Sequence, residues 1–478
     1  MIVADTARAD EAYAVDPLVM PTLRSLAADG TVFTRAFASA PWTLPSHGAL
    51  FTGCYSSKHG AHGEHPYLQS ENITLAEAFA EAGYETWGAT NNTWISGEFG
   101  FDQGFETFWR GWQLIQSDHD VGSVLHEPGP VQRLKAGVSS IASGNPVVNA
   151  INASYTQYQR SRGDYGGGRT TDRLVSWLQK RDSDRPFFGF VNYLEPHIEY
   201  APPQAYTEPF LPTGGSYSEA RAIRQDPRAF DVGEYGLDER EFRLLRALYR
   251  GELAYVDAQL DRIRTALKNA GAWEETILIV LGDHGENLGD HGFFGHQYNC
   301  YDSLLHVPLV ITGGPFDNGG TSEQLVQLTD VGPSLLEAAH ITATDFQNQA
   351  QGQSFHPDQR GEREYVFAEY LSPQPSIERL EARFGELPAH VYEYDRSLFV
   401  IRSTDEKLIR GTDGHVEYYQ IDRDPREQTD RSASEQRRVE RLSERLGTWR
   451  DGFDHAEVSG EVSITDSTKE RLAQLGYM

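Results

Sequence analysis

Residues 40–53 read A-P-W-T-L-P-S-H-G-A-L-F-T-G, and the rest of the chain is interpreted outward from this stretch. Pro45 and Ser46 are typical of the first turn of a helix, because proline's missing N–H costs nothing there. The apolar residues 49–51 could then form a buried face. Thr43 would lie near the positive end of that helix, where unpaired backbone N–H groups favour an anion. Taken alone, the pattern favours a simple N-cap role for Thr43 over a catalytic one.

Two other motifs shift the balance toward a functional site. Residues 1–5 (M-I-V-A-D) and residues 277–284 (I-L-I-V-L-G-D-H) are apolar runs that end in carboxylates. Runs of this kind are typical of buried parallel strands, which carry polar residues at their C-terminal ends. Asp5 and Asp283 are therefore expected at the place where the fold gathers its ligands, with His284 beside them.

With these residues in place, the chain resembles the sulfatase family of the alkaline-phosphatase superfamily. The resemblance covers most of the length and rests on six motifs in the family's order. They are D-T-A-R-A-D (5–10), T-L-P-S-H-G-A-L-F-T-G (43–53), P-H-I-E-Y-A-P-P (196–203), G-D-H-G-E-N-L-G-D-H-G (282–292), L-L-H-V-P-L-V-I (304–311) and Y-Y-Q-I-D-R-D-P-R-E (418–427). A single motif would be weak evidence, whereas the ordered set is specific.

Strand–helix alternation predicts an α/β sandwich. The resemblance implies the same fold, an alkaline-phosphatase-like sandwich with a central, mostly parallel sheet. We expect a catalytic domain over 1–360, with an insertion at about 111–168 that includes a helix at 131–143, and a loop-like stretch at 204–236. We expect a small α+β subdomain over 361–478, with an antiparallel sheet and a closing helix. Expected helices are 21–30, 73–82, 170–180, 237–270, 329–339 and 434–446, and expected strands are 1–4, 32–37, 84–90, 186–192, 276–281, 307–312, 365–370, 397–403, 406–410 and 417–421.

The composition is strongly acidic, with 70 Asp and Glu against 42 Lys and Arg and a formal net charge of −28. Such a field argues against nucleic acid or an anionic membrane as partner. It also predicts adaptation to high salt, although an ordinary acidic cytosolic enzyme remains open. Cys54 and Cys300 cannot form a disulfide framework. With neither a signal peptide nor a long apolar span, we expect a cytoplasmic protein without a membrane span, although residues may have been lost before Met1.

The candidate metal ligands are Asp5, Thr43, Asp283 and His284. Two carboxylates, one imidazole and one hydroxyl favour Mn²⁺ or Zn²⁺, with Ca²⁺ and Mg²⁺ less favoured but open. A plain turn is the alternative explanation for an Asp–His pair next to glycine. The P-D-x-x-x-H element that two-zinc relatives use for a second ion is absent, so the resemblance implies a single metal.

The nucleophile position departs from the family's pattern. In sulfatases this position holds a cysteine or serine that is oxidised to formylglycine within C-x-P-x-R, but here it is Thr43, and His47 takes the arginine position as a candidate substrate-binding residue. Threonine is not a substrate for that conversion. The chain is in this respect similar to the nucleotide pyrophosphatase/phosphodiesterase and lipoteichoic-acid-synthase branches. A phospho-threonine intermediate and a preference for phosphate mono- and diesters follow from this likeness.

The resemblance assigns further site residues. His197 falls in the family's P-H-x-P-Y element and would donate to a nonbridging oxygen or protonate the leaving group; a strand-end cap is the alternative. His296 stands where relatives often carry a lysine that contacts the ester oxyanion. Asn91 falls near another lysine position and is a candidate for substrate binding. 

Other polar residues receive supporting or neutral roles. Arg8 is expected to brace Asp5 and its loop, and Glu286 to support the metal ligands. Four other histidines near the motifs are interpreted as surface residues: His59, His62, His65 and His291. For His59, His62 and His65, a place in the pocket or in a second metal site is the alternative.

Three classes of function remain open. The first is a metal-dependent hydrolase of phosphate esters, or of sulfate esters as in arylsulfatases. The second is a transferase that passes a phosphoryl-linked head group to an acceptor, and the missing membrane anchor favours the hydrolase over it. The third is an inactive binding protein, which the retained metal ligands argue against. The substrate is expected to be a small-molecule, glycan or lipid ester, and the sequence leaves the oligomeric state open.

Overall fold

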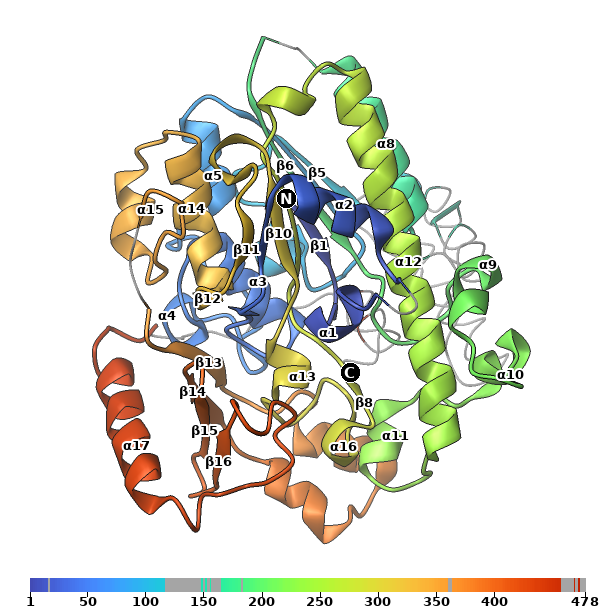
Figure 1. Ribbon diagram of the computed structural model, residues 1–478, viewed down its shortest axis with the longest axis vertical. Helices are drawn as coiled ribbons and strands as arrows, with labels where there is room; N and C mark the ends of the chain where they lie inside the picture. Colours follow the sequence, from blue (N-terminus) through green and yellow to red (C-terminus); the bar gives the residue numbers. More distant parts are fainter. Residues whose placement is uncertain are drawn as a thin grey trace.

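The computed structural model describes residues 1–15, 18–116, 165–181, 184–359 and 363–456, together with the single residues 148, 151, 152, 155, 468 and 472. An eight-stranded sheet with helices on both faces forms its centre (Figure 1). In spatial order the strands are β11 (Gly320–Ser322), β2 (Thr31–Phe33), β10 (Leu309–Thr312), β7 (Leu278–Gly282), β1 (Ile2–Ala4), β6 (Phe187–Tyr193), β4 (Glu85–Thr90) and β5 (Thr107–Arg110). The predicted central α/β sheet is confirmed.

Strand pairing in this sheet is mostly parallel, as predicted. β1 pairs in parallel with β6 on one side and β7 on the other, and only β10 runs antiparallel to its neighbours. The register places Ala4 opposite Gly282. The residues that follow, Asp5 and Asp283, therefore leave the sheet side by side at its carboxyl edge.

Successive residues of the central strands point to opposite faces of the sheet. In β1, Ile2 packs into one hydrophobic cluster and Val3 into the other. One cluster includes apolar side chains of α2 (Pro21–Asp29), α8 (Gly167–Lys180) and α12 (Glu239–Asn269). The other includes those of α3 (Thr43–Thr52), α5 (Leu75–Glu81) and α14 (Val331–Ala338). The sheet is thus buried on both faces, which explains its almost uninterrupted apolar strands.

Local signals in the sequence set the ends of several helices. α5 and α12 begin at capping boxes, Thr74 with Glu77 and Asp238 with Glu241. α3 ends at Gly53, whose φ of 69° lies in the left-handed region that glycine tolerates. Several other described α-helices are short: α1 (Ala9–Ala12), α4 (Ser56–His59), α9 (Gln204–Thr207), α10 (Tyr217–Ala222), α11 (Pro227–Asp231), α13 (Asp302–Leu305), α15 (Thr344–Gln349) and α16 (Ile377–Phe384).

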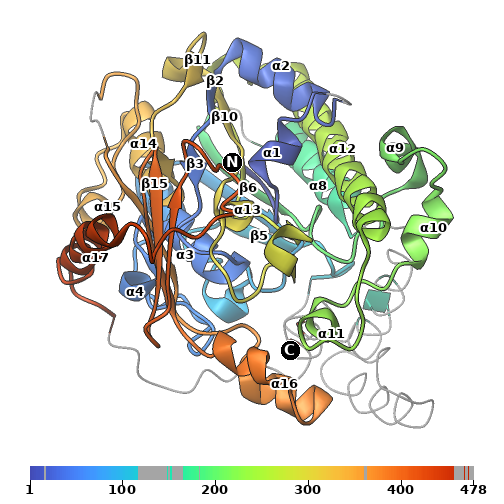
Figure 2. The same cartoon turned by 60° about the horizontal axis from the view of Figure 1, so that its bottom comes forward.

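The C-terminal part forms the expected antiparallel sheet with a closing helix (Figure 2). It contains β13 (Val366–Tyr370), β14 (Leu398–Arg402), β15 (Glu406–Gly411), β16 (Val416–Gln420) and α17 (Gln436–Arg450). One face packs on α17 through Ile401, Leu408 and Leu442. The other face joins the main core through Val366 and Val400. This sheet therefore shares the hydrophobic core of the catalytic part.

Some expectations need correction. The stretch 204–236 is not simply a loop, because α9, α10 and α11 lie within it. The single strand expected at 32–37 is split into β2 and β3 (Ala36–Phe37), and β3 pairs with β12 (Val326–Gln327) outside the main sheet. The helix expected at 131–143 lies outside the described residues. Within the described part of the chain, no helix is both long and apolar enough to cross a membrane.

Candidate metal centre and active site

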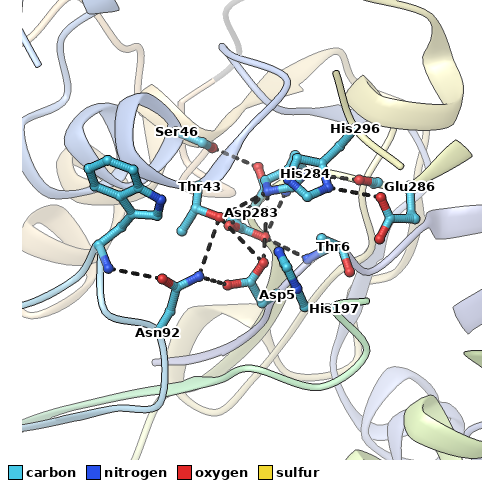
Figure 3. Close-up of polar contacts among 12 residues, drawn as sticks. Asp5, Thr6, Thr43, Ser46, Asn92, His197, Asp283, His284, Glu286 and His296 are labelled. Atoms are coloured by element: carbon cyan, nitrogen blue, oxygen red, sulfur yellow. Dashed lines mark hydrogen bonds and ion pairs between the residues drawn. The ribbon is translucent and has the colours of Figure 1, made fainter. Parts of the chain in front are cut away.

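Asp5, Asp283 and His284 form one buried cluster at the carboxyl edge of the sheet (Figure 3). One ligand atom from each lies within 4.8 Å of the others, and none of the three side chains is exposed. Asp5 follows β1, and the Asp283–His284 pair follows the adjacent strand β7. The parallel pairing of these strands brings together residues that are 278 positions apart in the sequence.

Thr43 lies directly beside this cluster. Its Oγ1 is 3.2 Å from His284 Nε2 and 3.4 Å from Asp5 Oδ1. The helix N-cap is Trp42, so Thr43 is the first helical residue and not the cap. Ser46 donates from Oγ to the carbonyl oxygen of Asp283 at 2.6 Å, which ties the first turn of α3 to the metal-ligand segment. The side chain of Thr43 therefore faces the cluster at the positive end of a helix.

Backbone contacts fix the orientation of two ligands. Asp283 Oδ1 accepts hydrogen bonds from the backbone N–H of Thr6 at 3.0 Å and of His284 at 2.9 Å. The second carboxylate oxygen, Oδ2, is buried and has no hydrogen-bond partner among the described residues. His284 donates from Nδ1 to the carbonyl oxygen of Gly285 at 2.9 Å, which leaves Nε2 as the acceptor that faces the cluster. Asp283 Oδ2 and His284 Nε2 thus each have a lone pair available for a cation bound at the cluster.

Among the described residues, no lysine or arginine forms an ion pair with the carboxylates of Asp5 and Asp283. Burial raises the pKa of Asp5 well above its ordinary value and raises the pKa of Asp283 to about 7. His47 and His284 lie beside Asp283, but burial lowers the pKa of both rings, that of His47 to about 4. The guanidinium of Arg8 pairs with Asp10 and Asp290 instead. Two carboxylates, an imidazole nitrogen and a hydroxyl therefore fit a divalent cation, which would supply the missing positive charge.

His47 lies next to the cluster, one helical turn after Thr43. Its Nδ1 is 3.0 Å from the carbonyl oxygen of Thr43 and 3.4 Å from Asp283 Oδ2, and its Nε2 is 3.5 Å from Asn192 Nδ2. The ring is fully buried. These contacts make His47 a positioning residue for Thr43 and Asp283. Its expected role in binding substrate stays a prediction.

The asparagine that contacts the cluster is Asn92, while Asn91, its neighbour in the sequence, keeps its expected role in substrate binding as a prediction. Asn92 donates from Nδ2 to Asp5 Oδ2 at 2.6 Å and lies 3.5 Å from Thr43 Oγ1, while its Oδ1 accepts from the backbone N–H of Trp94. Asn91 accepts from Thr170 Oγ1 at 2.7 Å instead. Both residues directly follow β4, and an Asn–Asn pair at a strand end is the signal that could have pointed to Asn92.

Two further predicted residues join the site. The ring of His296 lies 4.9 Å from that of His284 and 5.1 Å from that of His197, measured between centroids. His296 Nδ1 is 2.8 Å from Glu286 Oε1, and His197 Nδ1 bonds the carbonyl oxygen of Ile198. Figure 3 shows His197 and His296 around the aspartates, with Glu286 beside His296. The structure therefore brings His197 and His296, two predicted catalytic residues, next to the candidate metal ligand His284.

The contacts agree with the bracing of its own loop expected of Arg8, which pairs with Asp10. The expected support of the metal ligands by Glu286 stays a prediction, because its side chain contacts His296. Arg8 donates to the carbonyl oxygen of Glu286 at 2.9 Å and to Asp290 at 2.6 Å, which braces the loop after Asp283. The prediction that His59 and His65 are surface residues is wrong, because both are buried. His59 Nε2 is 3.1 Å from the carbonyl oxygen of Pro45, and His59 Nδ1 accepts a hydrogen bond from the backbone N–H of Ala61. It therefore connects α3 to α4.

The family model for sulfatases matches residues 1–341. This chain belongs to the sulfatase family. An arylsulfatase of Clostridium perfringens is 24% identical over 447 residues, which cover 87% of this chain and 85% of the relative. The arylsulfatase K of Bos taurus is 23% identical over 438 residues, 87% of this chain and 74% of the relative. The prediction of an ester hydrolase is confirmed at this level.

Solved structures share the fold of this sulfatase-family chain. A phosphonate monoester hydrolase of Agrobacterium radiobacter superposes with a TM-score of 0.66 at 24% identity, over 94% of this chain and 95% of that protein. A phosphonate monoester hydrolase from Silicibacter pomeroyi gives a TM-score of 0.67 at 19% identity, over 96% of each chain. Identities this low support the shared fold alone. The alkaline-phosphatase-like sandwich expected from the resemblance is thereby confirmed.

We predict that metal binding to this sulfatase-family protein weakens as the pH falls below about 7. The metal-free folded protein holds a proton on Asp283 up to a pKa of about 7, against an ordinary value of 3.8. That proton stabilises the metal-free fold at low pH, and its contribution is lost as the pH rises from about 4 to about 7. A cation must displace the proton, so its affinity should fall by about tenfold for each pH unit below about 7.

Thermal midpoints with Mn²⁺ and with a chelator, measured from pH 5 to pH 8, check this prediction. The stabilisation by metal should increase with pH. An Asp283→Asn variant should lose the trend, whereas Asp358→Asn, which changes a carboxylate with 92% of its side chain exposed, should keep it. A metal-induced shift in midpoint that is the same at pH 5 and pH 8 would contradict the assignment.

Proposed function

We propose that this protein hydrolyses phosphate mono- and diesters in preference to sulfate esters, with Thr43 as the nucleophile. The observation that supports this most directly is the position of Thr43 Oγ1, within 3.4 Å of two candidate metal ligands. The hydroxyl stands at the start of α3, where the helix dipole favours the charge of an ester oxyanion. A bound divalent ion would lower the charge repulsion between the nucleophile and the ester.

In the proposed reaction, the Thr43 hydroxyl gives its proton to solvent, and Oγ1 forms a bond to phosphorus while the bond from phosphorus to the alcohol oxygen breaks. The resulting phospho-threonine is then cleaved by water, which restores the hydroxyl. Asn92 Nδ2 holds Asp5 Oδ2 at 2.6 Å and keeps Thr43 within 3.5 Å, so this amide orients the nucleophile. His47 holds the carbonyl oxygen of the same threonine.

The leaving alcohol needs a proton, and His296 is the better placed donor of the two predicted histidines. The carboxylate of Glu286 accepts a hydrogen bond from His296 Nδ1 at 2.8 Å, which fixes the orientation of the ring and leaves Nε2 as the nitrogen that would face the substrate side. His197 donates from Nδ1 to a carbonyl oxygen, and burial lowers the pKa of its ring well below the ordinary value. His197 would therefore donate to the ester only after the bound anion has helped it to take up a proton.

The preference for phosphate rests on the residue at the nucleophile position. The aldehyde hydrate of formylglycine allows a sulfated intermediate to collapse, and threonine cannot provide it. The fold shared with phosphonate monoester hydrolases agrees with a tetrahedral phosphorus substrate. Sulfate ester hydrolysis is the second candidate function, because the curated relatives include arylsulfatases.

A panel of chromogenic 4-nitrophenyl esters tests the proposal. The purified protein, supplied with Mn²⁺ and produced without a formylglycine-generating enzyme, should cleave phosphate mono- and diesters at least about tenfold faster than the sulfate ester. Phosphonate esters belong in the same panel. A higher kcat/KM for the sulfate ester would overturn the phosphate preference and favour the arylsulfatase alternative.

A further inference from the structure

Arg228, on the short helix α11, carries a positive charge that is almost completely buried. Only 4% of the residue is exposed. Its Nε is buried without a hydrogen-bond partner, and within the described ranges of the chain Arg228 forms no ion pair. Burying an unpaired guanidinium costs free energy, and charged groups that stay buried in proteins are usually paired. The arrangement therefore indicates a partner that is not part of this chain's described residues.

The place of α11 puts this charge next to the candidate active site. α11 packs on β9 (Phe294–Gly295), the strand that leads directly into His296. The rings of Phe230 and Phe294 lie 5.9 Å apart, and a Cβ built on Gly295 would meet Pro227 Cβ at 2.9 Å. Gly295 has a φ of 94°, so a larger residue would both strain the strand and push α11 away. The close contact holds α11 against the His296 segment.

The charges around Arg228 do not pair with its guanidinium directly. Burial lowers the pKa of the Arg228 guanidinium, and the negative charges of Asp226 and Asp231 oppose this shift, but neither carboxylate forms an ion pair with it among the described residues. Burial also lowers the pKa of His197, and the positive charge of Arg228 contributes to that shift. Asp226 binds Arg224 and Arg383 instead. Tyr298 also faces Arg228, but its hydroxyl donates to the carbonyl oxygen of Pro375.

We propose that Arg228 binds a second anionic group, such as a carboxylate, on the alcohol part of the substrate. This inference rests on the proposed function, which places the scissile group at Thr43 and the leaving oxygen near His296. A guanidinium presents a fork of donors that matches a carboxylate, phosphate or sulfate in two hydrogen bonds. The substrate class is then an ester whose alcohol is itself acidic, and Arg228 selects it against neutral alcohols.

Calorimetric binding to the metal-loaded protein tests the second site without turnover. Methylphosphonate offers the head group alone, while phosphonoacetate, 3-phosphonopropanoate and 4-phosphonobutanoate add a carboxylate at increasing distance. The best of the three should bind at least about tenfold more tightly than methylphosphonate. Arg228→Gln should remove this preference and leave the affinity for methylphosphonate within about twofold, because only the second anion loses its partner. Arg228→Lys should keep part of the preference.

Arg224→Gln is the matched control, because Arg224 lies in the same segment, is exposed and pairs with Asp226 and Glu234. It should keep the full preference. No preference in the wild-type protein, or an equal loss for all four ligands in both Arg228 variants, would overturn the inference. If the preference is found but no ester is hydrolysed, the proposed function fails while the anion site stands. If esters are hydrolysed without the preference, only the anion site fails.

Discussion

Replacing Thr43 with alanine should lower kcat/KM for the best phosphate ester by about 10³-fold or more, because the covalent route is lost. Thr43→Ser should keep part of the activity, since the oxygen remains and only a methyl group is removed. Mass spectrometry of enzyme quenched during turnover should find phosphate on Thr43. Steady-state kinetics of the two variants, with the elemental content of each preparation, provide the measurement.

Thr52→Ala is the matched control for this prediction. Thr52 lies at the other end of the same helix, is buried, and donates from Oγ1 to the carbonyl oxygen of Gly48 at 2.7 Å. Its replacement should lower stability and leave kcat/KM close to the wild-type value. If Thr43→Ala hydrolyses the best substrate at the wild-type rate, the nucleophile lies elsewhere.

Replacing Asp283 with alanine should weaken metal binding by more than about 100-fold and remove most of the activity. Asp283 contributes a carboxylate whose Oδ1 is held by two backbone N–H groups while Oδ2 has no hydrogen-bond partner among the described residues. Its removal takes away one of the two carboxylates in the candidate ligand set. Elemental analysis after dialysis, together with titration by Mn²⁺ and Zn²⁺, measures the effect.

Asp257→Ala separates metal loss from general destabilisation. Asp257 is also a buried aspartate that accepts from two backbone N–H groups, those of Thr22 at 2.9 Å and Leu23 at 2.8 Å, but it lies on α12 and outside the metal cluster. Its loss should lower the thermal midpoint and leave the metal content unchanged. Full metal occupancy in the Asp283→Ala variant would contradict the assignment of Asp283 as a metal ligand.

Much of the candidate site could be predicted because its main ligands follow strand ends. An apolar run that stops at a carboxylate is visible in the sequence, and in a parallel sheet such ends meet at one edge. Asp5, Asp283 and His284 were predicted on this basis, and the structure brings them within 4.8 Å of one another. Helix α5 could be predicted for a similar reason, since its capping box and apolar spacing are local signals.

The contacts that depend on tertiary packing could not be predicted from the sequence. Asn91 and Asn92 are adjacent and chemically identical, and only the exit angle of the chain from β4 decides which amide reaches Asp5. His59 is polar and follows a loop, so the sequence indicated a surface position. Its burial depends on hydrogen bonds with Pro45 and Ala61, which no periodicity reveals. The antiparallel course of β10 is likewise absent from its apolar pattern.

By itself, then, the sequence determined the strand ends that carry the ligands, the long helices and the threonine at the nucleophile position, because these are properties of residue type and spacing along the chain. Only the tertiary structure decided that His47 lies 3.4 Å from Asp283 Oδ2 and that Arg228 is buried without an ion pair among the described residues. Burial and pairing are set by segments distant in the chain. A charge's environment therefore cannot be read from its neighbours in the sequence.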